Sequence, residues 1–549
     1  MTNISERAGP EAPKNESRSI GSERAPSPAS KISPPIERGS GPEGIARAAA
    51  RLISRAVNQI EQRGLPLVDW PSPRVTTWIN VAQVAVWTAI AMAVLPGRGH
   101  FTYDQAYFYE LSVRVAETLR PPAYGPFVSG TSPAVMTPGG SLFLVYSIPF
   151  FVFRDPRVGV DWIILLSAFG LLLIDRSLKR LEADSSLRLA LISTLTWSMW
   201  HGRFTDTFWN ANLFLFSTPA LFYAAVRNAR DEQPSWYWSV LFGLLSALSM
   251  QIHASGALAI VACALVWVSQ RSQPFRLSRL GLALLGFVAA YVPYFVVELR
   301  DQWVNSTALL SAIPPGYDRQ AVSGSLGAWL LYPSHAQTSE ALTALFTGGW
   351  RGRLFGASLA AAGALSGLGL CVRFRPKLIP LLLIPALPLY FRLSGRPFYD
   401  HYVVAVLPFL CLPAAAGAAW LLSRPLLRWL AVAYFGAFAA SGVALLLAGQ
   451  QTLRPGDRWN GHTVDYQLER TRHAIASGAA VGSGPGDEGA FVEWVVARRL
   501  FHQPLTFGVG SYLCDVDFRL SGTDPPVWKH IHKPLVPLAP NSVFVCDPR

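Results

Sequence analysis

The sequence predicts an all-α polytopic membrane protein with about eleven transmembrane helices, short helices along the outer face and a small C-terminal α/β domain outside the membrane. Of its 549 residues, 51% are hydrophobic and 15% are charged, whereas about 25% are charged in soluble domains. The apolar residues form long runs, and strand-like segments such as PLTFGVGSYL follow the last of them. Lipid must therefore solvate most of the chain, which excludes an ordinary cytosolic enzyme.

The net charge of +13 is distributed in a way that indicates a membrane partner. The 47 Lys and Arg residues outnumber the 34 Asp and Glu residues, an excess that by itself would also fit a nucleic-acid-binding protein. The basic residues, however, occur in short clusters between apolar runs, where they orient membrane helices. We therefore expect membrane lipids as partners and no nucleic acid.

Residues 1–75 are expected to form a cytosolic tail. Residues 1–45 are rich in Pro, Ser, Gly, Glu and Arg and carry too little apolar surface to become ordered. Residues 45–62 show a helical pattern with Arg on one side, and they either lie on an anionic leaflet or form a solvated lead-in helix. Because this tail lacks the apolar core of a signal peptide, we expect the first span to direct insertion.

Hydropathy predicts the spans of a transmembrane domain that covers residues 76–449. Several spans are close to the minimum of about 17 residues. They are residues 76–96, 158–175, 187–201, 210–227, 236–252, 254–270, 280–299, 353–372, 378–393, 402–422 and 429–449. A further apolar run at 140–153 is shorter and contains Pro149.

Charge placement predicts that the run at 140–153 lies along the outer surface and does not cross the membrane. If it does not cross, every basic cluster between closely spaced spans falls in the cytosol, as the positive-inside rule requires. These clusters are residues 176–180, 227–230, 271–279, 373–377 and 423–428. We therefore expect the N-terminus in the cytosol and the C-terminus outside.

The first outer loop contains the candidate catalytic residue, Asp104. It follows the first span and precedes a helical stretch with an apolar stripe of Tyr107, Leu111 and Val115. A carboxylate here either acts as a general base or serves as the N-cap of that helix. Glu110 falls on a different face of the same helix, and we expect it to be solvated.

Several short motifs occur in order along the predicted outer regions. They are Tyr103-Asp104, Thr137-Pro138-Gly139-Gly140, GRFTD at 202–206, Trp209-Asn210-Ala211-Asn212, Gln251-Ile252-His253, and Asp400-His401-Tyr402 with Pro408 after it. In this order they resemble the GT-C superfamily of polytopic glycosyltransferases, especially the bacterial protein mannosyltransferases, aminoarabinose transferases and lipopolysaccharide galacturonosyltransferases. The resemblance covers most of residues 76–410. Members commonly have Asp-Glu where this chain has Asp104-Gln105.

The resemblance implies a GT-C fold and an inverting transfer of a sugar from a polyprenyl-phosphate donor to a cell-envelope acceptor. The acceptor would be a glycolipid, a polysaccharide or a protein hydroxyl, at the outer face of a bacterial inner membrane. Within the motifs, Arg203 and Asp206 match the family's Arg and second acidic residue. Tyr103 and Tyr402 accompany them as residues that would bind donor or acceptor.

The reaction gives these residue types a chemical purpose. An acceptor hydroxyl becomes a good nucleophile as its proton leaves, so a base such as Asp104 is needed beside it. The leaving phosphate gains negative charge, which cationic side chains stabilise. The candidates for this role are Arg203, His253, Arg396 and His401.

Each of these residues also has a structural interpretation. The two arginines can reach lipid headgroups, His253 can bond a backbone carbonyl in a tight turn, His401 can pair with Asp400, and Asp206 can cap the fourth span. No compact Asp/Glu/His cluster in the sequence demands a metal, and the need for a divalent cation is left open.

Residues 450–549 are predicted to form a periplasmic α/β domain, in which Cys514 and Cys546 either form a disulfide or stay free. In the outer loop 300–352, either Tyr332 and His335 are lid residues over the donor, or Trp329 and Tyr332 form an interfacial anchor.

Two other classes of protein fit the number of spans. One is a secondary transporter or lipid-linked sugar flippase, and the other is a polysaccharide polymerase or ligase. Transporters usually have repeated halves and ionisable residues at mid-membrane depth. This sequence shows no obvious repeat, and its ionisable residues gather at the predicted outer boundary, which favours the glycosyltransferase.

Overall fold

The computed structural model describes the greater part of the predicted transmembrane domain. The described residues are 71–127, 136–231, 235–271, 276–311, 363–371, 404–448 and 463–477, with positions 55, 59, 492, 495–497 and 499–502 in addition. All of them belong to one unit that begins at Ala50. The predicted span at 378–393, and nearly all of the N-terminal tail, lie outside the described residues.

Helices make up most of the described residues and lie close to the predicted spans. They are α2 (Pro73–Val94), α5 (Arg157–Arg180), α8 (Phe214–Arg230), α9 (Trp236–Ile252), α10 (Gly256–Ser269), α11 (Leu277–Arg300), α17 (Leu407–Leu410), α18 (Leu412–Leu422) and α19 (Arg428–Ala448). Within the described ranges, four helical segments are long and apolar enough to cross a membrane: Pro73–Val94, Arg157–Arg180, Leu277–Arg300 and Val404–Leu422. The mainly helical, multi-pass architecture is confirmed, and the number of about eleven spans stays a prediction.

The predicted span at 187–201 is wrong in one respect, because it is two helices. α6 (Ser185–Trp197) ends where Ser198 adopts an extended backbone with ψ of 139°, and α7 (Met199–Thr205) follows it. The Ser198 hydroxyl accepts a hydrogen bond from the His201 N–H at 3.1 Å and so caps α7. A single serine does not interrupt an apolar run, so hydropathy could not reveal this break.

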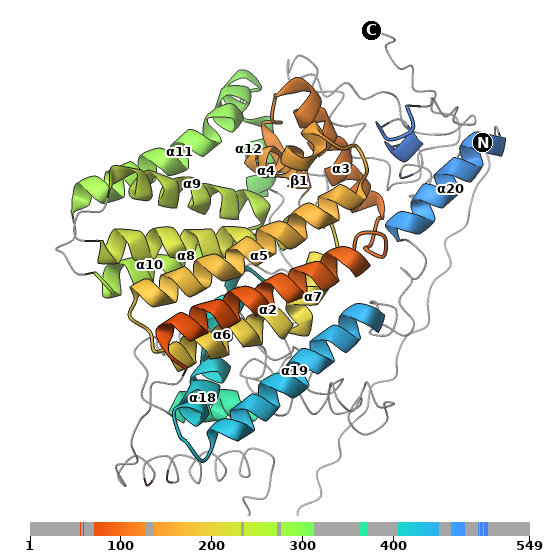
Figure 1. Cartoon of the computed structure of the whole chain (residues 1–549). Coiled ribbons are helices and arrows are strands. Elements are labelled where there is room, and N and C mark those ends of the chain that lie inside the picture. Colours follow the sequence, from red (N-terminus) through yellow and green to blue (C-terminus); the bar gives the residue numbers. More distant parts are fainter. Residues whose placement is uncertain are drawn as a thin grey trace, which may run out of the picture. The chain divides into compact units, whose positions relative to one another are not determined.

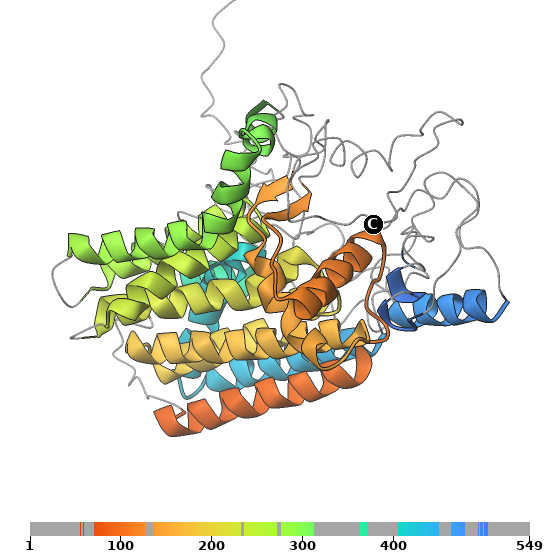
Figure 2. The same ribbon diagram turned by 90° about the horizontal axis from the view of Figure 1, so that it is seen from above.

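Five of the helices form a row in which each packs against the next: α5 lies against α2, α8 against α5, α9 against α8 and α11 against α9 (Figures 1 and 2). At one end of this bundle the C-termini of α2 and α19 meet, where Arg98 Nη1 donates to the Leu447 carbonyl at 3.0 Å. We call it the α3 end, because α3 follows there.

The opposite end of the bundle is rich in basic residues, and we call it the basic end. There Arg180 from α5 pairs with Asp231 at 2.7 Å, and Arg227 from α8 pairs with the same carboxylate at 2.6 Å. Arg230 pairs with Glu182 at 2.8 Å. The predicted basic clusters at 176–180 and 227–230 therefore share one end of the bundle, away from Asp104, as the positive-inside argument requires.

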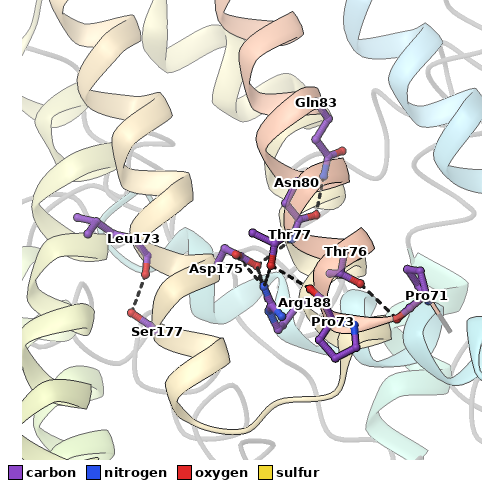
Figure 3. A network of polar contacts seen from close by, with 10 residues as sticks. All are labelled: Pro71, Pro73, Thr76, Thr77, Asn80, Gln83, Leu173, Asp175, Ser177 and Arg188. Atoms are coloured by element: carbon purple, nitrogen blue, oxygen red, sulfur yellow. Dashed lines mark hydrogen bonds and ion pairs between the residues drawn. The ribbon is translucent and has the colours of Figure 1, made fainter. Parts of the chain in front are cut away.

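A buried ion pair joins three helices toward the basic end (Figure 3). Arg188 in α6 donates to Asp175 in α5 at 2.8 Å, and their side chains are 2% and 6% exposed. The same guanidinium donates to the Thr77 hydroxyl at 2.9 Å, and Asn80 Nδ2 donates to Asp175 at 2.8 Å, so α2 is tied in as well. Each charge thus has several partners, which is the condition under which a buried ion pair is tolerated.

Several short elements follow α2 at the α3 end. They are α3 (Tyr103–Thr118), the antiparallel strands β1 (Tyr124–Phe127) and β2 (Met136–Pro138), α4 (Ser141–Ser147) and the 3₁₀ helix η1 (Ile148–Phe151). The last two have seven and four residues, and at about 1.5 Å per residue in α4 and about 2.0 Å in η1 they extend roughly 18 Å, well short of the roughly 30 Å of a bilayer core. This length agrees with the prediction that 140–153 does not cross. Phe143 of α4 stacks on Phe108 of α3 at 5.7 Å between ring centroids.

The C-terminal segment contacts the α3 end through α20 (Val464–Ser477) and through Arg499. Thr463 forms an isolated antiparallel bridge with His100, which precedes α3. Arg499 Nε donates to Glu110 at 2.6 Å, and the Glu110 side chain is 14% exposed. The expectation that Glu110 is solvated is therefore wrong, because a partner distant in sequence covers it. The predicted strands beyond residue 502 lie outside the described residues.

Candidate active site

Asp104 occupies the first turn of α3, and its side chain is exposed. The N-cap residue of this helix is Thr102, whose N–H donates to Gln105 Oε1 at 3.0 Å. The N-cap interpretation of Asp104 is therefore wrong, since Thr102 and Gln105 form the capping box. Gln105 is buried, and its side chain serves the capping box. This role accounts for a glutamine at the position next to Asp104. A carboxylate in the first helical turn is also stabilised by the helix dipole.

Asp206 lies directly after α7, in the turn that leads to the 3₁₀ helix η2 (Asn210–Leu213). Its side chain accepts a hydrogen bond from the Thr207 hydroxyl at 2.8 Å, and the residue is 3% exposed. Asp206 does not cap the fourth span, because Trp209 precedes η2 and Leu213 precedes α8.

Gly99 brings the turn of Asp206 against the segment that leads into α3. A Cβ atom at Gly99 would lie 2.0 Å from the Asp206 carbonyl oxygen, a distance that no side chain tolerates. Glycine at this position therefore permits the approach. The two predicted acids thus belong to segments that are packed together at the α3 end.

Gln251 and His253, at the end of α9, have structural contacts. Gln251 Oε1 accepts from the Ser141 N–H at 2.9 Å, and its Nε2 donates to the Ala290 carbonyl at 3.2 Å, which joins α9 to α4 and α11. Gly139 precedes α4 with φ of 84° and leaves room for the Gln251 side chain. His253 Nδ1 accepts from the Ser255 N–H at 3.0 Å within the turn between α9 and α10. Any contact of this imidazole with a substrate must use Nε2.

Glu298, near the end of α11, is a buried acid that the sequence did not single out. It is 0% exposed and accepts from the Tyr124 hydroxyl at 2.8 Å and from the Ser306 N–H at 2.8 Å. Burial, together with the hydrogen bond and the charge of Glu298, raises the pKa of Tyr124, so its phenol stays protonated and donates. This contact anchors the β1–β2 hairpin, and α4 after it, to α11 and to α12 (Val304–Ser311).

The remaining predicted site residues are placed only in part. Tyr103 is the first residue of α3 and Arg203 lies in α7; the structure places their backbones and not their side chains. Other residues fall wholly outside the described ranges: Arg396, His401, Tyr402, Tyr332, His335, Cys514 and Cys546. Across the described part of the chain, no group of three or more His, Cys, Asp or Glu side chains could hold a metal ion.

The fold is shared with a solved structure, in agreement with the fold that the sequence resemblance predicted. It is similar to ArnT from Cupriavidus metallidurans bound to undecaprenyl phosphate, with a TM-score of 0.51 and 15% identity over 79% of this chain and 87% of that one. At this identity the similarity establishes a shared fold and nothing further.

Weaker similarities extend to two other structures. ArnT in the apo state has a TM-score of 0.46 at 14% identity, over 79% of this chain and 90% of that one. The Archaeoglobus fulgidus oligosaccharyltransferase AglB, in complex with an inhibitory peptide and a dolichol-phosphate, has a TM-score of 0.39 at 13% identity, over 72% and 57%. No family model and no curated protein matches the sequence.

Proposed function

We propose that this protein is a membrane glycosyltransferase that moves a sugar from a polyprenyl-phosphate donor to a hydroxyl group of a cell-envelope acceptor. The observation that carries the proposal is the exposed carboxylate of Asp104 in the first turn of α3, five residues after Gly99, which packs against the turn of Asp206. The shared fold with ArnT, whose structure contains undecaprenyl phosphate, supports a lipid-linked donor. The α3 end would face the periplasm of a bacterium, and the basic end its cytosol.

In the proposed reaction Asp104 acts as general base. It accepts the proton of the acceptor hydroxyl while that oxygen attacks the anomeric carbon of the sugar. The bond between the anomeric carbon and the phosphate oxygen breaks, and its electron pair leaves with the polyprenyl phosphate. Attack opposite to the leaving group inverts the configuration at the anomeric carbon, the geometry that inverting glycosidases use for water.

The other predicted residues would bind the two substrates. Arg203, Arg396 and His401 would stabilise the additional negative charge on the departing phosphate, and His253 would do so through Nε2. Tyr103 and Tyr402 would contact the sugar or the acceptor. Asp206 would orient the acceptor, because its turn packs against the segment that leads to Asp104.

A secondary transporter or flippase is the second candidate, and the break between α6 and α7 favours it, because transporters commonly use discontinuous helices. The buried charges argue against it. Asp175 and Arg188 lie within about two turns of the helix ends at the basic end, and they are fully paired with each other. A transporter would place ionisable groups in a cavity at mid-membrane depth.

The test is transfer of a labelled sugar from synthetic polyprenyl-phosphate donors in proteoliposomes. We expect Asp104→Asn to lower the rate at least about a hundredfold, the lower limit for removal of a general base. Asp301→Asn, which changes an acid just beyond α11, is the matched control and should leave the rate unchanged. Full turnover by Asp104→Asn would reject the assignment of the base. Movement of labelled lipid without transfer of its sugar would favour the flippase.

A further inference from the structure

The C-terminal segment contacts the chain on the N-terminal side of Asp104. The Val464 N–H donates to the Gly99 carbonyl at 3.0 Å, and the Asp465 N–H donates to the Gly97 carbonyl at 3.0 Å. These bonds join the start of α20 to the short segment between α2 and α3. Arg157, in the first turn of α5, donates to the Asp465 carboxylate at 2.6 Å and 2.8 Å. The entrance to α3 is therefore held by residues more than 300 positions away in sequence.

A second residue of the C-terminal region, Arg499, contacts α3 on the C-terminal side of Asp104. The Arg499 guanidinium binds both carboxylate oxygens of Glu110 and donates to Glu117 at 2.8 Å. Side chains of Arg499 and Glu110 are 12% and 14% exposed, so this pair is largely shielded from water. A shielded, two-pronged arginine–carboxylate contact fixes orientation more strictly than an exposed ion pair.

The spacing of residues along α3 separates the Arg499 contact from Asp104, the proposed general base. Glu110 and Glu117 are seven residues apart, close to two helical turns, so both lie on one face. Asp104 precedes Glu110 by six residues, which places it about a third of a turn around the helix from that face. Arg499 thus contacts a face of α3 other than the one that carries Asp104.

We propose that two parts of the C-terminal region, Thr463–Asp465 and Arg499, form a clamp that positions Asp104, with Arg499 as the positioning residue. This inference rests on the proposed function, because it assigns the clamp to the glycosyltransferase base. The clamp acts at both sides of Asp104, at Gly97–Gly99 and at Glu110. Gly99 also packs against the Asp206 carbonyl, so the clamp holds the segment that leads into α3 and contacts the turn of Asp206.

Charge reversal in the full-length protein tests the clamp. The variants are Arg499→Glu, Glu110→Arg and the double variant. Glu469 is an exposed residue of α20, and Glu469→Arg is the control for the charge change of Glu110→Arg. Amide hydrogen exchange of α3 in lipid nanodiscs reports the docking. The kcat and KM for transfer from a synthetic polyprenyl-phosphate sugar report the position of the base.

We expect each single reversal to speed exchange in α3 and to lower kcat about tenfold or more, with a smaller change in KM, since misplacement of a catalytic group by about 1 Å can cost a hundredfold. The double variant should recover part of both losses, because it restores the pair with position 110 while the new glutamate still faces Glu117, and Glu469→Arg should resemble the wild type.

The outcomes separate the clamp from the proposed function. Unchanged exchange in the single variants, no recovery in the double variant, or faster exchange with an unchanged kcat would each overturn the clamp. If the wild type transfers no sugar, the proposed function fails, and exchange in α3 then decides whether the segment docks as described.

Discussion

The two ends of the helix bundle each hold an aspartate at a helix terminus, and the two aspartates have opposite surroundings. Asp175 lies toward the basic end, where its side chain is 6% exposed and accepts hydrogen bonds from Arg188 and Asn80. Asp104 is exposed at the α3 end, in the first turn of a helix. A carboxylate enclosed by permanent donors stabilises the fold, whereas one that solvent can reach is able to exchange a proton with a substrate. Of these two aspartates, only Asp104 is therefore placed to act as a general base.

The largest expected effect lies at the basic end and concerns stability. Arg188→Leu leaves the buried Asp175 carboxylate without its counter-charge, so we expect the free energy of unfolding to fall by about 3–5 kcal/mol. Equilibrium unfolding in mixed micelles measures the change. The double variant Arg188→Leu with Asp175→Leu should regain most of the loss, because a buried ion pair can be replaced by apolar residues. An unaffected single variant would show that the pair is solvated.

At the α3 end the corresponding structural acid is Glu298. Glu298→Ala leaves the Tyr124 hydroxyl and the Ser306 N–H without their acceptor, so we expect a loss of about 1–3 kcal/mol in the free energy of unfolding. A double-mutant cycle with Tyr124→Phe measures how much of this comes from the phenol. Strictly additive losses would contradict a direct interaction between the two side chains.

A smaller effect is expected at Gly99, and it concerns activity. Gly99→Ala forces the Asp206 turn away from the segment that precedes α3, so we expect sugar transfer to slow by about tenfold. The control is Gly281→Ala in α11, where an added Cβ meets no atom within 4 Å. Equal activity of the two variants would mean that the approach of the two segments does not matter for transfer.

The sequence predicted the helices well and the polar contacts poorly. Spans such as 236–252 match α9 because a long apolar run must become a helix in lipid, where backbone groups find no water. The prediction that the run at 140–153 does not cross followed from charge placement, which reports topology independently of hydropathy.

The contacts that sequence reasoning missed all depend on tertiary structure. Glu110 was expected in solvent because its partner, Arg499, lies 389 residues away. Asp175 and Glu298 sit inside or beside apolar runs, where hydropathy averages them out and says nothing about their donors. The Ser198 break is likewise a property of one backbone conformation and one capping bond.

The central claim is that the lipid-linked donor meets the protein at the α3 end. Photo-crosslinking with a diazirine-bearing polyprenyl phosphate, followed by peptide mapping, tests it most directly in the full-length protein in nanodiscs. We predict labelled peptides from the segment around Asp104 and from the turn around Asp206, with labelling reduced by excess unlabelled polyprenyl phosphate. Competable labelling confined to the α5–α6 connection around Asp175 and Arg188 would contradict the account.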